Sequence, residues 1–248
     1  MKALYIASTG MSAQERNVEV ISNNIANMRT TGFKRQRAEF QDLLYQQIRR
    51  AGSQTSEEGT MLPAGLEIGS GVRTVATPRI MSQGSVVATE KELDLAVRGE
   101  GFFVVELPDG TAAYTRDGAF ERDDQGRLVN SSGFPVQPGI VIPQDAVSVS
   151  VSADGLVEAY IGADAVPTQL GQLQLARFVN KAGLASIGDN LFAATPASGE
   201  AQLGLPKADG TGDLLQGYLE QANVNSVTEI ADLIAAQRAY EMNARVIS

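Results

Sequence analysis

Apolar residues recur every three or four positions along the start of the chain. The series is Leu4, Ala7, Met11, Gln14, Val18, Ile21, Ile25 and Met28. This a/d spacing predicts an amphipathic helix with one apolar seam. Thr30, Thr31 and Gly32 then disfavour helix, so we expect the helix to end near Met28 or Arg29.

The other end of the chain repeats the same period. Its heptad positions are Ile230, Leu233, Gln237, Tyr240, Ala244 and Ile247, after an expected helix start at Asn225 or Ser226. Most amphipathic helices only cover the core of their own domain. Long connectors join both helices to the middle of the chain, which favours packing against other molecules. The pattern leaves open whether the last helix frays at Ser248 or continues in a longer chain.

Between the two helices the apolar period changes to two. The alternating or continuous apolar positions are Leu93, Leu95, Val97, Phe102–Val105, Val147, Val149, Val151, Leu173, Leu175 and Phe178. Turn signals such as Pro108-Asp109-Gly110 and Asp154-Gly155 separate them, which is typical of antiparallel strands. The fold class is therefore α+β: terminal helices packed as a coiled-coil-like pair, and a central antiparallel β-rich domain resembling a sandwich or barrel.

Changes in composition suggest where the domains begin and end. Residues 46–71 and 193–213 are rich in Gly, Ser, Thr, Gln or Pro, which is typical of linkers. We expect a helical domain made of residues 1–33 and 214–248. Residues 34–70 and 193–213 would connect it to a β-rich domain of residues 71–192.

The composition of the chain restricts its chemistry. Its 248 residues include no Cys, His or Trp, which excludes disulfides, thiolate nucleophiles, His/Cys metal sites and the usual neutral-pH general base. No catalytic, cofactor-binding or metal-binding residue is nominated. The net charge of -9 opposes nucleic-acid binding. No apolar run is long enough for membrane insertion, and Met1 to Gly10 do not resemble a cleaved signal.

Two short motifs hint at ligands but fit turns better. Gly99-Glu100-Gly101 begins like a dinucleotide fingerprint, yet Val104 stands where the third glycine belongs and a strand follows. Residues 123–126, Asp-Asp-Gln-Gly, suggest a calcium loop, but Ser132 occupies the position of the bidentate Glu. A carboxylate-based peptidoglycan hydrolase remains a remote alternative, because paired carboxylates need only be near in space. The low aromatic content weighs against it.

The two ends of the chain carry opposite charge. Residues 1–37 hold six basic and two acidic side chains, including the cluster Arg29, Lys34, Arg35 and Arg37. Residues 213–248 hold two basic and five acidic ones. The segments are either electrostatic partners or two solvated faces, whose exposed ion pairs contribute at most about 1 kcal/mol each.

Three asparagines lie in or near the last turns of the first seam, although Asn is a poor helix former. Their amides would either fix the register of neighbouring helices or mark a helix that unwinds. The residues expected at an assembly interface are Leu4, Ala7, Met11, Val18, Ile21, Asn23, Asn24, Ile25, Asn27, Met28, Ile230, Leu233, Gln237, Tyr240, Ala244 and Ile247.

Four motifs in order resemble one protein family. Residues 22–27 (SNNIAN) with 31–34 (TGFK) resemble the N-terminal signature of the bacterial flagellar rod and hook proteins, and residues 237–243 (QRAYEMN) resemble their C-terminal signature. Residues 99–103 and 114–118 also match. Within this family of basal-body rod proteins, residues 45–66 resemble the insertion of distal-rod members. Similar proteins usually continue the last helix beyond the position of Ser248.

The resemblance implies a function for the whole chain. It would be a structural subunit of the distal rod, without cofactors, that polymerises into a straight helical tube. This tube would transmit torque from motor to hook, with terminal helices around the export channel and the β domain outside. The implied partners are proximal-rod and hook proteins, the periplasmic and outer-membrane rings, and the flagellar type III export apparatus. The rod would span the periplasm, reached without a cleaved signal. A proximal-rod or hook-type axial protein is the alternative.

Overall fold

The computed structural model describes residues 2–52, 63–162, 166–208 and 210–247. The chain divides into two compact units. The helical unit contains Met1–Ala26, Gln36–Arg79 and Asn225–Ser248, and the β unit contains Asn27–Arg35 and Ile80–Val224. Neither unit is continuous in sequence, so the chain passes between them four times.

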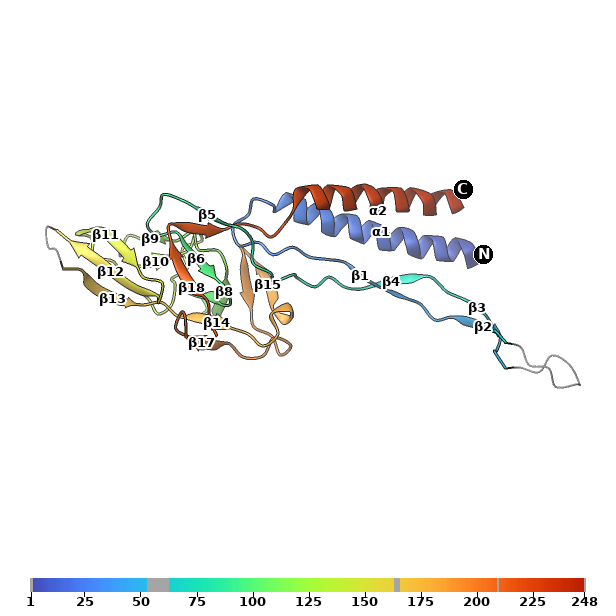
Figure 1. Cartoon of the computed structure of the whole chain (residues 1–248), viewed down its shortest axis with the longest axis horizontal. Coiled ribbons are helices and arrows are strands. Elements are labelled where there is room, and N and C mark those ends of the chain that lie inside the picture. The colour runs from blue at the N-terminus through green and yellow to red at the C-terminus, as the bar shows by residue number, and fades with distance from the viewer. Residues whose placement is uncertain (1, 53–62, 163–165, 209, 248) are drawn as a thin grey trace, which may run out of the picture. The chain divides into compact units, whose positions relative to one another are not determined.

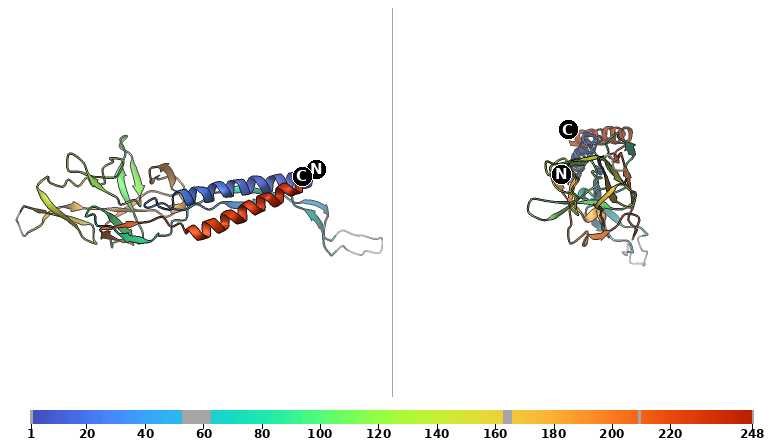
Figure 2. Two further views of the ribbon diagram at one scale, coloured as in Figure 1. Left: turned by 90° about the horizontal axis from the view of Figure 1, so that it is seen from above. Right: turned by 90° about the vertical axis from the view of Figure 1, so that its left-hand side faces the viewer.

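Both predicted terminal helices are confirmed. Helix α1 spans Lys2–Ala26 and α2 spans Ser226–Ile247, and they lie side by side in both views (Figures 1 and 2). The start of α2 is fixed by Asn225, whose Oδ1 accepts hydrogen bonds from the backbone N–H groups of Val227 and Thr228 at 3.0 and 3.3 Å. In the described residues, neither helix is apolar enough along its length to cross a bilayer.

Helix α1 ends slightly earlier than the sequence predicted. Its last helical residue is Ala26, and the N–H of Thr30 donates to the carbonyl of Asn27 at 3.1 Å in the turn that follows. The side chain of Thr30 also donates to Asn27 Oδ1 at 3.1 Å. Asn27 therefore serves a turn because its short amide competes with the helical backbone bonds.

The rest of the helical unit is a two-stranded antiparallel ribbon (Figure 1). Strand β1 (Glu39–Asp42) pairs with β4 (Val72–Ala76), and β2 (Gln46–Arg49) pairs with β3 (Leu66–Ile68). Thr9 Oγ1 accepts a hydrogen bond from the N–H of Val72 at 3.3 Å, which joins the ribbon to α1. Within the segment expected to be an outgoing linker, residues 46–49 and 66–68 form these paired strands. Residues 53–62 of the expected insertion lie outside the described residues.

The β unit is built from antiparallel strands, as predicted. A six-stranded sheet has the order β15-β16-β8-β7-β14-β17, and a three-stranded sheet has the order β11-β12-β13. Two-stranded pairs complete the unit: β18–β6, β19–β5 and β10–β9. Among the described residues none of these sheets closes on itself. The domain is therefore not a closed barrel.

The strand bounds are as follows, together with one short 3₁₀ helix. The sheet strands are β5 (Val86–Ala88), β6 (Leu95–Arg98), β7 (Phe102–Glu106), β8 (Ala112–Thr115), β9 (Glu121–Arg122), β10 (Leu128–Val129), β11 (Ala146–Val151), β12 (Leu156–Ile161), β13 (Thr168–Gln172), β14 (Leu175–Arg177), β15 (Ala185–Gly188), β16 (Leu191–Ala193), β17 (Gln202–Gly204), β18 (Asp213–Gln216) and β19 (Tyr218–Glu220). The 3₁₀ helix η1 spans Lys181–Gly183.

Strand β7 is buried on both faces, which accounts for its continuous apolar run. Phe103 and Val105 belong to the larger core cluster, where the ring of Phe103 meets that of Phe120 edge-on at 4.9 Å. Phe102 and Val104 point into a second cluster around Phe178. A strand with two buried faces does not alternate in polarity.

The predicted turns fall where strands join. Asp109 follows β7 and its Oδ1 accepts from the N–H of Thr111 at 2.9 Å, while Gly155 joins β11 to β12 with a φ of +83°. Asp123 Oδ1 accepts hydrogen bonds within its own loop, from the N–H groups of Gln125 and Arg127 at 2.9 and 2.7 Å. The Asp-rich run is therefore a hairpin tip. Within the expected returning linker, β17 pairs with β14.

Candidate assembly site

Helices α1 and α2 pack antiparallel within the helical unit. Asn24 near the end of α1 contacts Glu229 near the start of α2, and Gly10 faces Asn243 at the other end of the pair. A side-chain carbon added at Gly10 would lie 2.9 Å from Asn243 Nδ2. The absence of that carbon lets the two helices approach closely at this point.

The buried face of α1 is offset from the predicted seam. Ala13, Val20 and Asn24 are buried, and each lies one residue before a seam position, Gln14, Ile21 or Ile25. One residue turns the helix by about 100°. The face of α1 that is buried within this unit is thus adjacent to the predicted seam. The buried face and the seam share Ala7 and Ile21.

The sixteen predicted interface residues separate into three groups by exposure. The buried ones are Ala7, Ile21 and Asn24. Those of intermediate exposure are Met11, Val18, Ile25, Asn27, Leu233 and Ala244. The exposed ones are Leu4, Asn23, Met28, Ile230, Gln237, Tyr240 and Ile247.

The apolar period of the sequence does not reveal the residues that α2 buries against its own unit. These are Glu229 and Ala236. Alanine and glycine carry little hydrophobic signal, and a glutamate reads as a surface residue, so a periodicity of large apolar residues selects the adjacent face instead. Small residues at helical spacing do not single out Ala236 either, because Ala231 and Ala235 have that spacing and are exposed.

Asn24 has a defined structural role. Its Nδ2 donates to the carbonyl of Gln36 at 2.8 Å and to Glu229 Oε2 at 3.1 Å, and its Oδ1 accepts from the N–H of Gln36 at 2.9 Å. Helix α1 continues to Ala26, so unwinding does not explain this asparagine. One buried amide thereby joins α1, α2 and the start of the ribbon.

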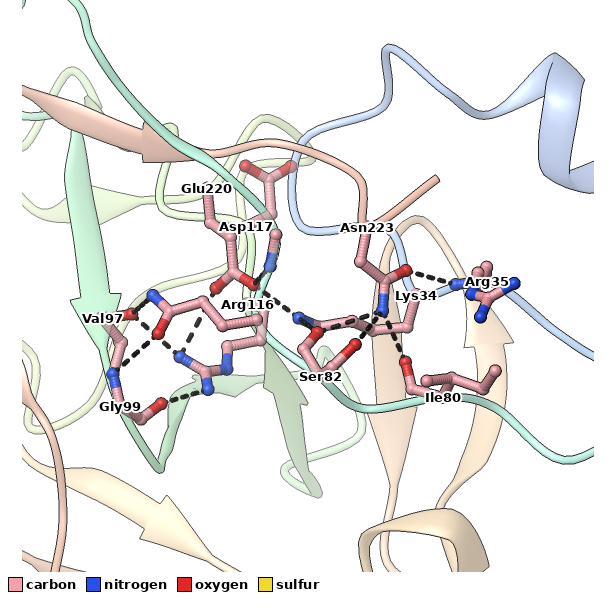
Figure 3. Close-up of polar contacts among 12 residues, drawn as sticks. Lys34, Arg35, Ile80, Ser82, Val97, Gly99, Arg116, Asp117, Glu220 and Asn223 are labelled. Atoms are coloured by element: carbon pink, nitrogen blue, oxygen red, sulfur yellow. Dashed lines mark hydrogen bonds and ion pairs between the residues drawn. The ribbon is translucent and has the colours of Figure 1, made fainter. Parts of the chain in front are cut away.

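The β unit contains a buried ion pair that the charge pattern only hinted at. Lys34 Nζ and Glu220 Oε1 are 2.5 Å apart, with side chains 1% and 0% exposed (Figure 3). Lys34 Nζ also donates to the carbonyl of Ser82 at 2.8 Å, and Glu220 Oε1 accepts from the N–H of Gly84 at 2.9 Å. Lys34 belongs to the basic cluster and Glu220 to the acidic end of the chain. For this pair, the solvated interpretation is wrong.

Arg116 extends this cluster toward the core. Its guanidinium donates to the carbonyls of Val97 (3.1 Å) and Gly99, and Nη1 lies 3.5 Å from Glu220 Oε2. The group also lies 5.5 Å from the ring centre of Phe102, a cation–π distance. Burial lowers the pKa of both Lys34 and Arg116, and the charge of Glu220 opposes each shift.

The glycine motif at residues 99–101 is a backbone turn. Gly99 and Gly101 have φ angles of +108° and +137°, and strand β7 follows directly. A phosphate site of the dinucleotide type needs a helix N-terminus at that point. Within the described ranges, no three metal-ligating side chains gather into a possible ion site.

Comparisons with known proteins cover both ends and the middle of the chain. Residues 4–34 match the family model of the flagella basal body rod protein, and residues 96–159 match the flagellar hook protein FlgE/F/G D1 domain. Residues 215–248 match the flagellar basal body rod FlgEFG protein C-terminal model.

Whole-chain relatives decide the family. The flagellar basal-body rod protein FlgG of Caulobacter vibrioides is 54% identical over all of this chain and 95% of its own length. The proteins of that name from Buchnera aphidicola (strain APS) and Borreliella burgdorferi are 49% and 45% identical, covering 99% and 100% of this chain and 94% of each relative. The chain belongs to the flagellar basal-body rod protein family. It is a structural subunit of the distal rod and not an enzyme.

Family membership gives the buried ion pair a context. The N-terminal rod model ends at Lys34, and the C-terminal rod model includes Glu220. The pair therefore joins the two matched terminal segments of a rod protein across 186 positions of sequence.

Proposed function

We propose that this rod subunit polymerises with copies of itself into a straight helical tube. The terminal helices form the wall around the export channel, packed in the heptad manner of a coiled coil, and the β-rich domain faces outward. Contacts that repeat without closing generate such a helical assembly. Many interlocked subunits then transmit torque from the motor to the hook.

The observation that carries the proposal is an apolar surface on the helical unit that its own packing does not cover. Leu4, Ile230 and Tyr240 are 42%, 49% and 43% exposed, although they lie at the heptad positions that the sequence marks as seams. One face of each helix is used within the unit, and the adjacent apolar face remains in solvent. Exposed apolar patches of this kind are typical of protein–protein contact surfaces.

A groove beside the start of α1 supports the same proposal. It has a volume of about 310 Å³ and lies between α1 and the ribbon, with walls that include Tyr5, Ile6 and Ile68. The ribbon itself is mostly exposed, and an isolated two-stranded ribbon is only marginally stable in water. A neighbouring subunit packed along it supplies the missing cover.

The experiment compares matched serine variants of the full chain. Ile230→Ser and Tyr240→Ser reduce the apolar face of α2, whereas Val179→Ser removes an exposed apolar residue from the β unit. We expect the helical variants to lower the fraction of sedimenting polymer and to shorten filaments in electron micrographs, with wild-type helicity. The control polymerises normally. Filaments of wild-type length from a variant that carries both Ile230→Ser and Tyr240→Ser would contradict the proposed helical wall.

The partners follow from this position in the flagellum. We propose contacts with proximal-rod and hook proteins at the two ends of the polymer and with the surrounding rings along its length. The subunit reaches the periplasm through the type III export apparatus without cleavage of a signal. Secretion of the full-length chain, with its first residues intact by mass spectrometry, tests the export route.

The hook-type or proximal-rod alternative draws only on weaker matches. The family model that matches residues 96–159 is described for hook and rod proteins together, and a 28% identical relative from Bacillus subtilis is named flagellar hook-basal body complex protein FlhP. Complementation separates these roles: restoration of a strain lacking its distal-rod subunit, but not of one lacking its hook subunit, favours the distal rod.

A further inference from the structure

Three short segments of the β unit flank all four passages of the chain between the units. These crossing segments are residues 27–35, 80–84 and 220–224. Residues 27–35 follow α1 and precede the ribbon, residues 80–84 follow the ribbon, and residues 220–224 precede α2. Every crossing therefore begins or ends in one of three segments that belong to the same unit.

Asn223 bonds to both of the other crossing segments. Its Oδ1 accepts from the N–H of Arg35 at 2.8 Å, and its Nδ2 donates to the carbonyls of Ile80 and Ser82 at 2.7 and 3.0 Å (Figure 3). The N–H of Ile80 donates to the carbonyl of Arg35 at 2.9 Å. One amide side chain thus holds three backbone segments in a fixed register.

The Lys34–Glu220 ion pair connects the same three segments. Lys34 comes from the first segment, Glu220 from the third, and the pair contacts the carbonyl of Ser82 and the N–H of Gly84 in the second. The N–H of Gly32 also donates to the carbonyl of Glu220 at 2.7 Å. The bonds of Asn223 and the Lys34–Glu220 ion pair together contact all three crossing segments.

Stability alone is a weak explanation for this pair. Removing two charges from water is costly, and apolar replacement of a buried ion pair is often neutral or stabilising. Glu220 Oε2 and Arg116 Nε also lack hydrogen-bond partners among the described residues, so the cluster is not fully satisfied. What charged and amide groups provide, and apolar ones do not, is a defined direction for each backbone segment.

We propose that Lys34, Glu220 and Asn223 form a crossing lock. The lock holds all four chain passages at one place in the β unit and opens as a single cooperative element. Its opening releases the three crossing segments together while the core of the β unit stays folded. This inference concerns the single subunit, and it holds or fails independently of polymerisation.

Hydrogen exchange measured by mass spectrometry on the full-length, unassembled chain tests the lock. The variant Lys34→Met/Glu220→Leu keeps apolar bulk at both positions but removes the directional bonds. We expect exchange in all three crossing segments to accelerate about tenfold or more, because the variant leaves the N–H of Gly84 and the buried guanidinium of Arg116 without the carboxylate of Glu220. One buried polar group that loses its partner shifts an opening equilibrium by about that factor. Strands β7 and β8 should exchange at the wild-type rate.

Two further variants make the result decisive. Asn223→Ala removes the amide bonds and leaves the buried pair, so it should accelerate the same three segments even where the double variant does not fold. Asp154→Asn, which breaks the exposed ion pair with Lys207 in the same unit, is the control and should leave them unchanged. Wild-type exchange in the foldable variants, or acceleration confined to the mutated segment, would overturn the proposal.

Discussion

Asn24 Nδ2 donates a hydrogen bond to Glu229 Oε2 across 3.1 Å, joining the last turns of α1 to the first turn of α2. Both side chains are buried, and the two residues stand 205 positions apart in sequence. The contact fixes which turn of one helix faces which turn of the other. A buried polar residue commonly specifies register in this way where apolar packing alone would tolerate sliding.

Asn24→Ala should therefore destabilise the helical unit. The variant removes one donor from buried Glu229 and both bonds to the backbone of Gln36, and each lost buried bond costs about 1–3 kcal/mol. Alanine is the better helix former, so a loss of stability isolates the tertiary bonds. Urea unfolding followed by circular dichroism at 222 nm measures it. Ser22→Ala, at an exposed position of the same helix, is the control and should change stability by less than about 0.5 kcal/mol.

Gly32→Ala should destabilise the β unit by more than the cost of placing alanine at the positive φ of residue 32. Gly32 has a φ of +67°, and an added Cβ would lie 2.7 Å from the backbone carbon of Arg116 and the nitrogen of Asp117. Gly133→Ala is a matched control, because its φ is +82° and its Cβ would meet open space. The control should lose roughly 1–2 kcal/mol in thermal or urea unfolding. An equal loss in both variants would show that the close approach at Gly32 relaxes without cost.

The sequence predicted the elements of this fold better than their faces. The a/d period found both helices, because the period of a helix does not depend on what covers it. It selected the face of Ile21 and Ile25 and missed Ala13 and Val20 on the adjacent face, because Gly10 and Ala13 allow close approach without contributing hydrophobic signal. Which face a neighbour covers depends on three-dimensional packing, and periodicity does not record it.

The buried polar residues were the least predictable part of the site. Lys34 and Glu220 are surface residue types, and their pairing spans 186 positions, so only the opposite charges of the two termini pointed toward it. The ribbon strands β2 and β3 were missed for a related reason. They are exposed along their length and only four and three residues long, so any apolar alternation in them is too short to mark a strand.

Asp117 should make the β unit less stable as the pH rises through the acid range. Burial raises the pKa of its carboxyl, while hydrogen bonds from Ala119 and Asn190 oppose the shift. Because the folded state holds this proton more tightly, the contribution of Asp117 is greatest below pH 3.8 and is lost as the pH rises through the raised pKa. Asp117→Asn removes this dependence. The stability of the variant relative to wild type should therefore improve between pH 3 and pH 7 in urea unfolding, and a flat difference would contradict the assignment.

Gln216 should protect an open edge of the β unit from intermolecular strand pairing. Strand β11 lies at the edge of its sheet, and Gln216 Oε1 accepts from the N–H of Val151 at 2.9 Å while Nε2 donates to the carbonyl of Val149 at 2.7 Å. A side chain that occupies these backbone groups prevents another strand from binding them. Gln216→Ala should accelerate hydrogen exchange in residues 146–151 and raise light scattering on heating. Gln172→Ala removes one exposed side-chain bond, to the carbonyl of Asp154, and is the control. If both variants scatter light equally, the edge of β11 is protected by something other than Gln216.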